Sequence, residues 1–240
     1  MIGLPDHVTA CLFDLDGVLT GTAELHRAAW KETFDVVLAK HGQPPFTEAD
    51  YNNHVDGRPR FDGVRAFLES RDIHLPEGPP DAPAGDDTVQ AVGNRKNELV
   101  QQIIADRGVN PYPGSVRYLE AAQAAGLKIG VVTSSANGKA VLEAADLTKF
   151  VETRIDGVVI TERGLRGKPA PDSFLAGAEA LGVDKANAAV FEDALSGVQA
   201  GKAGQFGYVV GVDRVGQAAE LAAHGADIVV QDLAELLEDK

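Results

Sequence analysis

Short apolar runs alternate with helical patterns at the start of the chain and again from about residue 111 to the end. Five runs, rich in Val, Ile and Phe, read VTACLFD, KIGVVTS, AAVFED, FGYVVGV and DIVV. Runs this short and apolar are typical of strands buried on both faces of a sheet. Helical spacing lies between them, for example over residues 172–181, before Gly182. The alternation predicts an α/β fold, a Rossmann-like and mostly parallel sheet with helices on both faces.

Residues 22–110 follow a different pattern, which looks helical and lacks clear strands. A Pro-, Gly- and Asp-rich stretch, PEGPPDAPAGDD at 76–87, interrupts it and predicts a loop or mobile segment. We therefore expect a core domain made of residues 1–21 and 111–240, with a helical cap domain inserted at 22–110. Because the chain would pass between the two parts twice, the arrangement suits a cap that closes on a hinge.

Composition and charge exclude several functions. The formal charge of -14 over 240 residues argues against non-specific nucleic-acid binding and against an anionic membrane surface. No apolar run reaches the length of a membrane span, and MIGLPDHV lacks the pattern of a signal peptide. The single cysteine, Cys11, excludes a disulfide within the chain and is expected as a small buried strand residue. These features favour a cytoplasmic protein without a nucleic-acid or membrane partner.

Polar residues follow three of the predicted strands, and a lysine follows a fourth, less certain strand segment. They are Asp14 and Asp16, Thr133 and Ser134, Glu192 and Asp193, and Lys168. Taken singly, such residues are often a turn, a helix cap, a solvated helix start or a surface lysine. Together they are more specific, because ligands of parallel sheets bind at the carboxyl ends of the strands. Two carboxylates as close as those in FDLDGVLT are also costly unless a cation or a proton accompanies them.

The segments DLDGVLT, VVTSS, GKPAPD and FEDALSG resemble the four motifs of the haloacid dehalogenase-like superfamily of phosphotransferases, and the resemblance covers essentially the whole chain. It implies that Asp14 is the nucleophile, which forms an aspartyl-phosphate, and a metal ligand. Asp16 would bind the metal through its backbone carbonyl and act as general acid and base. Asp193 is implied as a further ligand of Mg²⁺, and Glu192 as support for the metal shell.

The same resemblance gives the remaining core residues a role. Thr133, Ser134 and Lys168 would hold the phosphoryl oxygens and supply the electrostatic stabilisation that phosphoryl transfer needs. A dehalogenase attacks carbon and needs neither magnesium nor the second aspartate. The presence of Asp16 therefore favours phosphoryl transfer.

Three segments of the insert, TAELHRAAWK, GRPR and RKN, resemble the cap of the β-phosphoglucomutase family. By that resemblance, His26 would help to position Asp16 or relay a proton to it. Thr22 is expected to be a hinge residue, because it stands where the insert joins the core. Arg60 and Lys96 would hold the distal phosphate of a bisphosphate that turns around in the site, a task for which Arg is well suited. Asn97 would contact the sugar or a phosphate.

The resemblance implies an isomerase of carbohydrate metabolism that interconverts β-D-glucose 1-phosphate and glucose 6-phosphate. The reaction would pass through an aspartyl-phosphate and β-glucose 1,6-bisphosphate, with Mg²⁺ as cofactor and a monomer as the active form. A sugar-phosphate or small phosphomonoester phosphatase on the same scaffold is the alternative. Gly21 and Ala136 depart from the mutase pattern, where an aspartate and a lysine are common, and they leave the exact sugar phosphate open.

Overall fold

The computed structural model describes residues 2–237 and divides into two compact units. Unit 1 comprises Met1–Gly21 and Val109–Lys240, and unit 2 comprises Thr22–Gly108. Met1 and residues 238–240, which the sequence analysis assigns to the core, lie outside the described residues. Residues 109 and 110, assigned to the insert by their pattern, group with unit 1, where the Gly21 amide donates to the carbonyl of Asn110 at 3.1 Å. Between residues 2 and 237, no helix is long and apolar enough to cross a membrane.

Unit 1 is built on a six-stranded sheet in the order β3-β2-β1-β4-β5-β6, and all neighbouring strands are parallel. The strands are β1 (Ala10–Phe13), β2 (Lys128–Val132), β3 (Thr153–Ile155), β4 (Ala188–Glu192), β5 (Tyr208–Val212) and β6 (Ile228–Val230). The five apolar runs form five of these strands, and the predicted α/β class is confirmed. The sixth strand, β3, was not predicted, because its three residues TRI carry neither an apolar run nor an alternating pattern.

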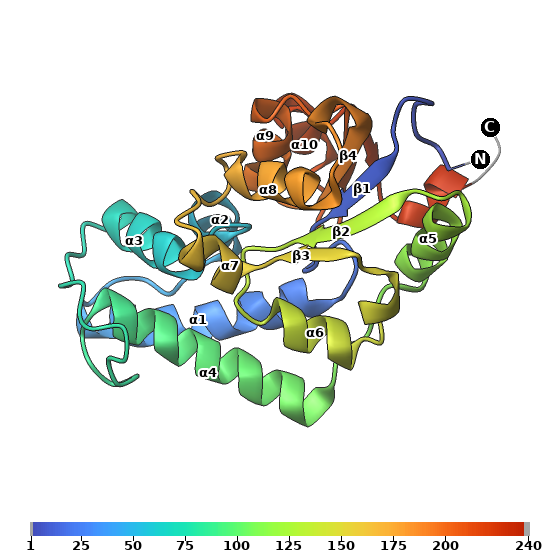
Figure 1. The fold of residues 1–240 in the computed structure, drawn as a ribbon. Coiled ribbons are helices and arrows are strands. Elements are labelled where there is room, and N and C mark those ends of the chain that lie inside the picture. The colour runs from blue at the N-terminus through green and yellow to red at the C-terminus, as the bar shows by residue number, and fades with distance from the viewer. Residues whose placement is uncertain (1, 238–240) are drawn as a thin grey trace. The chain divides into compact units, whose positions relative to one another are not determined.

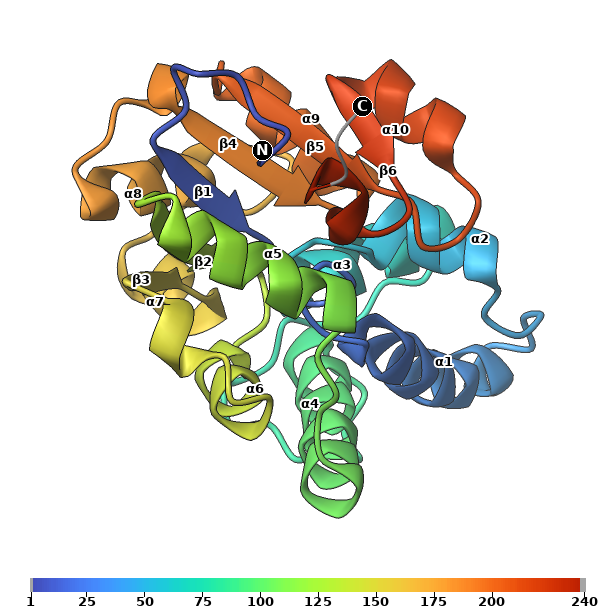
Figure 2. The same ribbon diagram turned by 90° about the vertical axis from the view of Figure 1, so that its right-hand side faces the viewer.

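Helices of unit 1 cover both faces of this sheet, with α8, α9 and α10 on one face and α5 on the other (Figures 1 and 2). The helices of the unit are α5 (Pro113–Ala124), α6 (Gly138–Ala144), α7 (Gly157–Glu162), α8 (Asp172–Leu181), α9 (Leu195–Ala203) and α10 (Ala218–His224), with 3-10 turns η2 (Thr148–Phe150), η3 (Lys185–Asn187) and η4 (Leu233–Leu237). Helix α8 ends at Gly182 in the left-handed conformation, as the sequence predicts.

Both faces of the central strand β1 are buried, which explains why its sequence is continuously apolar. Leu12 packs into the cluster that contains Phe174 of α8. Its neighbour Phe13 points to the opposite face, where its ring stacks on Phe191 at 4.3 Å and meets Tyr118 of α5 edge-on. Cys11 is fully buried in the same strand, as expected.

Unit 2 is helical, and no strand occurs among residues 22–108. It contains α1 (Thr22–Lys40), α2 (Glu48–Asp50), the π-helical turn η1 (Tyr51–Val55), α3 (Arg60–Ser70) and α4 (Val89–Arg107). Its core is aromatic: Trp30 stacks on Phe34 at 4.9 Å, and Phe34 contacts Phe46 and Phe67. The helical pattern predicted for this segment is confirmed.

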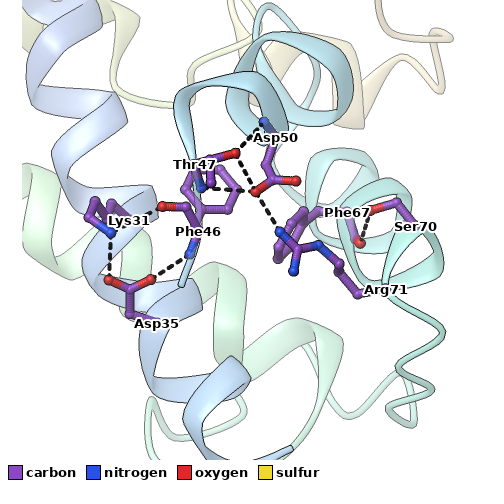
Figure 3. Close-up of polar contacts among 8 residues, drawn as sticks. All are labelled: Lys31, Asp35, Phe46, Thr47, Asp50, Phe67, Ser70 and Arg71. Carbon is purple, nitrogen blue, oxygen red and sulfur yellow. Dashed lines mark hydrogen bonds and ion pairs between the residues drawn. The ribbon is translucent and has the colours of Figure 1, made fainter. Parts of the chain in front are cut away.

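Side-chain hydrogen bonds hold the short helix α2 in place (Figure 3). The Thr47 hydroxyl accepts from the Asp50 amide at 3.2 Å, and an oxygen of Asp50 accepts from Thr47 N at 2.9 Å and from Arg71 at 2.6 Å. Burial alone would raise the pKa of Asp50, but the bonds from Thr47 and Arg71 lower it overall. Since three residues cannot form a stable helix alone, the cap at Thr47 and the contact with Arg71, the residue that follows α3, fix its position.

The predicted loop at residues 76–87 lacks regular structure, as expected, but its backbone is bound to α4. Asn94 donates its side-chain amide to the carbonyls of Pro80 and Ala82 at 3.0 and 3.1 Å. The Val89 amide donates to Pro76 O at 3.0 Å, and Ala82 is buried. These contacts anchor the loop to α4.

Candidate active site

Three neighbouring strands of unit 1 end at one edge of the sheet and bring polar residues together there. Strand β1 leads into Asp14, β4 ends at Glu192 and continues to Asp193, and β2 leads into Thr133. The Asp14 amide donates to the carbonyl of Phe191 at 2.9 Å, so the β1–β4 pairing extends to the acidic residues. The strand order reverses at β1, and ligands of parallel sheets bind at such a switch point.

Lys168 joins two of these carboxylates from a distant segment. Its ammonium donates to Asp14 Oδ1 at 2.6 Å, to Glu192 Oε1 at 2.5 Å and to the carbonyl of Val132 at 3.2 Å. All three donors of the ammonium are used. The side chain is fully buried and passes 4.8 Å from the ring centroid of Phe174. The core motifs expected to act together therefore meet in one buried cluster.

The expectation that Lys168 follows a strand is wrong. Strand β3 ends at Ile155, and α7 (Gly157–Glu162) lies between it and Lys168. The lysine stands in the irregular segment after that helix, and its peptide bond to Pro169 is cis. The buried ammonium is thus placed by a loop and by the carboxylates that it contacts, which a strand-end argument could not have shown.

The charges of this cluster perturb one another. Burial raises the pKa of Asp14 well above its usual range; Lys168 opposes this shift, and the nearby carboxylates of Glu192 and Asp16 add to it. Burial alone would lower the pKa of Lys168, but Asp14 and Glu192 raise it above the ordinary lysine value. Lys168 therefore stays protonated at neutral pH. One ammonium between two buried carboxylates leaves an excess of negative charge, which a further cation or a proton can neutralise.

Carboxylate oxygens of Asp14, Glu192 and Asp193 lie within 4.8 Å of one another and could hold a metal ion. Such hard oxygen donors suit a divalent cation such as Mg²⁺. The two oxygens of Glu192 already have protein donors, Oε1 from Lys168 and Oε2 from the Ala194 amide at 2.8 Å. The donor set therefore fits a cation held mainly by Asp14 and Asp193, with Glu192 fixing Lys168 beside it.

Gly17 makes room for the carboxylate of Asp193. Its φ of +91° is a conformation that residues with a side chain rarely adopt. A Cβ at this position would lie 1.8 Å from Asp193 Oδ2, closer than any contact allows. The glycine of DLDGVLT is thus required by the acidic site that it faces.

Asp16 and the loop after β2 are connected through Thr133. The Thr133 hydroxyl donates to Asp16 Oδ2 at 3.3 Å and accepts from the Ser135 amide at 3.0 Å. Gly157 lies against the same loop, because a Cβ there would come within 2.6 Å of the carbonyl of Ser134. The predicted residues Thr133 and Ser134 therefore belong to the same edge as the acidic residues.

In unit 2, two of the predicted residues form a buried pair. The ammonium of Lys96 lies 2.7 Å from His26 Nδ1, and both side chains are buried. Lys96 also lies over the ring of Trp30, with its nitrogen 4.9 Å from the ring centroid. Trp30 itself packs into the aromatic core of the unit, as the ring stacking with Phe34 shows.

The other predicted residues of unit 2 lie on separate elements. Arg60 is half-buried at the start of α3, donates to the carbonyl of Gly93 at 3.5 Å, and has its pKa lowered by burial. Asn97 is half-buried on α4, next to Lys96. Thr22 is the first residue of α1 and of unit 2, and it is buried.

Two residues that sequence reasoning did not single out lie beside the acidic cluster of unit 1. Gln217 donates to the backbone carbonyl of Asp193 at 2.9 Å, and Arg214 donates to the carbonyl of Gly17 at 2.8 Å. Both follow the end of strand β5. The rule that polar residues gather after strands, applied to the run FGYVVGV, would have found them.

Both the sequence and the fold of this chain are similar to those of known proteins. A family model described as haloacid dehalogenase-like hydrolase matches residues 8–205. The β-phosphoglucomutase of Mycobacterium bovis is 55% identical, over 99% of this chain and 94% of the relative. The β-phosphoglucomutase of Bacillus subtilis is 32% identical, over 95% and 91%. A hydrolase of Pseudomonas syringae has a TM-score of 0.78 at 23% identity, covering 95% of this chain and 96% of that structure, which is a likeness of fold.

Proposed function

Because this chain belongs to the haloacid dehalogenase-like hydrolase family, we propose that it is a phosphotransferase that interconverts β-D-glucose 1-phosphate and glucose 6-phosphate. The observation that carries the proposal is the 55% identity, over nearly the full length, with the Mycobacterium bovis β-phosphoglucomutase. The buried cluster of Asp14, Lys168 and Glu192 supports it, since phosphoryl transfer needs a carboxylate nucleophile held next to fixed positive charge.

Asp14 is assigned the nucleophilic attack. Its carboxylate forms a bond to phosphorus as the bond from phosphorus to the leaving sugar oxygen breaks, which yields an aspartyl-phosphate. Lys168 fixes the orientation of Asp14 through Oδ1 and neutralises part of the charge that the phosphoryl group brings. Glu192 holds Lys168 from the other side, so we assign it a positioning role in the metal shell rather than direct ligation.

Asp16 is assigned the proton transfer. Its carboxyl group gives a proton to the leaving sugar oxygen and takes one from the attacking hydroxyl in the reverse step. The hydrogen bond from Thr133 holds this carboxyl at the edge of the sheet, and Ser134 lies in the same loop to bind phosphoryl oxygens. Mg²⁺, held by Asp14, Asp193 and the backbone carbonyl of Asp16, would supply charge neutralisation for the anionic substrate.

The residues of unit 2 are assigned to the second phosphate. Arg60 and Lys96 would bind the distal phosphate of β-glucose 1,6-bisphosphate, Asn97 the sugar or a phosphate, and His26 would orient Asp16. The short contact between Lys96 and His26 supports a coupled role, because an ammonium that donates to an imidazole nitrogen fixes the ring and its tautomer. Thr22 is proposed as the hinge residue at which the chain enters unit 2.

A product assay tests the reaction. Purified protein with Mg²⁺, a trace of bisphosphate and β-glucose 1-phosphate is followed for glucose 6-phosphate and free phosphate in one tube, with the α anomer as control. Glucose 6-phosphate in large excess, from the β anomer alone, supports the mutase. Stoichiometric free phosphate without isomer makes the protein a sugar-phosphate phosphatase, which needs the same Asp14 and Lys168.

Two variants test the assigned residues. Asp14→Asn should abolish turnover of both products and leave the circular dichroism spectrum unchanged. Arg60→Ala should reduce mutase turnover more than hydrolysis of p-nitrophenyl phosphate, which has no second phosphate. Arg65→Ala, on the exposed face of the same helix, is the matched control. Equal losses on both substrates would remove the distal-phosphate role of Arg60.

A further inference from the structure

We propose that Arg214 is a positioning residue that holds the turn carrying Asp16, and that it thereby sets how well the enzyme expels poor leaving groups. The inference rests on the proposed function in one respect, the assignment of proton transfer to Asp16. Arg214 stands just after β5, in a loop that is itself ordered. Asp213 Oδ1 accepts from the amides of Val215, Gly216 and Gln217 at 3.2, 2.7 and 2.8 Å.

The guanidinium of Arg214 reaches the turn after the nucleophile. It donates through Nε to the carbonyl of Gly17 at 2.8 Å and through Nη2 to that of Val18 at 3.4 Å. A third donor, Nη1, binds the carbonyl of Gln231 at 2.7 Å. Three carbonyls from two segments are therefore fixed by one planar group. A lysine, with a single nitrogen, could not reproduce this geometry.

The turn needs this external support because of Gly17. A glycine at a φ of +91° has more conformational freedom than any other residue, and it directly follows Asp16. The carbonyl that Arg214 binds belongs to the Gly17–Val18 peptide, and rotation about the backbone bonds of Gly17 would move Asp16 relative to that peptide. Within the turn, Gly17 N donates to Thr20 O at 2.8 Å, but the carbonyls of Gly17 and Val18 point to donors outside it.

Ser115 supplies the second external donor. Its hydroxyl, fully buried in α5, donates to the carbonyl of Val18 at 2.7 Å. Arg214 alone donates to Gly17 among the side-chain contacts of the described residues, so it has the larger share in fixing the Gly17–Val18 peptide, one residue beyond Asp16.

Arg214 also contacts the segment by which the chain returns to unit 1 after residue 108. Its guanidinium carbon lies 3.8 Å from the ring centroid of Tyr112, and the Tyr112 amide donates to Leu19 O at 2.9 Å. Arg214 thus contacts both the turn at Gly17 and Val18, before the chain leaves the unit, and Tyr112, after it returns. A change at Arg214 should therefore be transmitted to the Asp16 turn without any direct contact with substrate.

Leaving-group dependence tests this role. A sugar oxygen must be protonated as it leaves, whereas p-nitrophenolate leaves without a proton. Phosphorylation of Asp14 is measured under enzyme excess, by acid quench, with p-nitrophenyl phosphate and with the sugar phosphate that the wild type consumes. In Arg214→Met we expect the rate with the sugar phosphate to fall about 30-fold, as for a proton donor misplaced by about 1 Å. The rate with p-nitrophenyl phosphate should change by less than about 3-fold.

Control variants separate positioning from stability. Arg163→Met removes an exposed ion pair with Glu179 on the same unit and should leave both rates unchanged. Arg214→Lys should recover little of the sugar-phosphate rate, because it lacks the planar fork. If Arg214→Met does not fold, as judged by circular dichroism, Ser115→Ala tests the same turn through the loss of the donor to Val18.

The outcomes are distinct from those of the product assay. Equal losses on both substrates, or no loss in a folded Arg214→Met, would overturn the positioning role. A selective loss on the sugar phosphate supports it, whether the wild type releases an isomer or free phosphate. The proposal for Arg214 can therefore stand when the mutase reaction fails, and it can fail when the mutase reaction is established.

Discussion

Removal of the Lys168 ammonium should destabilise unit 1 by an amount that depends on pH. Lys168→Met keeps the volume of the side chain but leaves the carboxylates of Asp14 and Glu192 buried without their common partner. Breaking a buried ion pair in this way costs about 3–5 kcal/mol, which lowers Tm by about 10 °C in a domain of this size. The double variant Lys168→Met/Glu192→Gln removes one of the stranded charges and should recover part of that loss.

The pH dependence has a definite sign. Folding raises the pKa of the Asp14 carboxyl. This group therefore lowers the stability of the folded protein once the pH rises above its unfolded pKa, and the penalty is complete above its folded pKa. Without Lys168, which opposes the shift, this penalty should grow. The deficit of the variant relative to wild type should therefore be largest near pH 8 and shrink towards pH 5. Lys168 itself has a raised pKa, so its charge is constant over this range.

Thermal unfolding by circular dichroism, in chelator and at several pH values, measures the deficit. The single tryptophan, Trp30, lies in unit 2, so its fluorescence gives an internal reference for the unit that was not changed. A deficit that is the same at pH 5 and pH 8 would refute the reasoning, because it would show that the uncompensated charges are not its cause. A double variant that is less stable than Lys168→Met would also refute the reasoning.

Three further outcomes follow from the geometry. Gly17→Ala should displace the carboxylate of Asp193 and raise the Mg²⁺ concentration needed for half-maximal activity by about 10- to 100-fold, as seen in a magnesium titration. Cys11, whose pKa is raised by burial, should react with a thiol reagent only in denaturant; rapid labelling of the native protein would contradict its burial. Asn94→Ala should speed proteolytic cleavage within residues 76–87, and an unchanged digestion pattern would show that its two hydrogen bonds do not anchor the loop.

Much of the fold could be predicted because its signals are local. A buried strand such as β1 is a short apolar run whatever its neighbours are, and α8 shows its apolar face and its terminal Gly182 within a few residues. The three residues of β3 lie at the edge of the sheet and are held by pairing with β2 rather than by their own pattern. Their place in the sheet could not be read from the sequence for that reason.

Some residues of the candidate site could likewise be predicted from the sequence, and others could not. Asp14, Asp16, Glu192 and Asp193 could be predicted because each stands next to a strand that the sequence shows. Lys168 was recognised by resemblance to a motif, and the strand expected before it is absent. Arg214 could have been singled out because it follows a strand, but nothing in GVDRVG shows which carbonyls it binds.

The sequence by itself determined the class of the sheet, the helical insert and the residue types available for chemistry. Only the tertiary structure decided which charges meet. Lys168 contacts a carboxylate 154 residues earlier and another 24 residues later, and Arg214 binds a carbonyl 197 residues away. Such contacts depend on the order in which the parallel strands lie side by side, with β1 between β2 and β4. Strand order is a property of the whole folded chain, whereas periodicity is a property of a few adjacent residues.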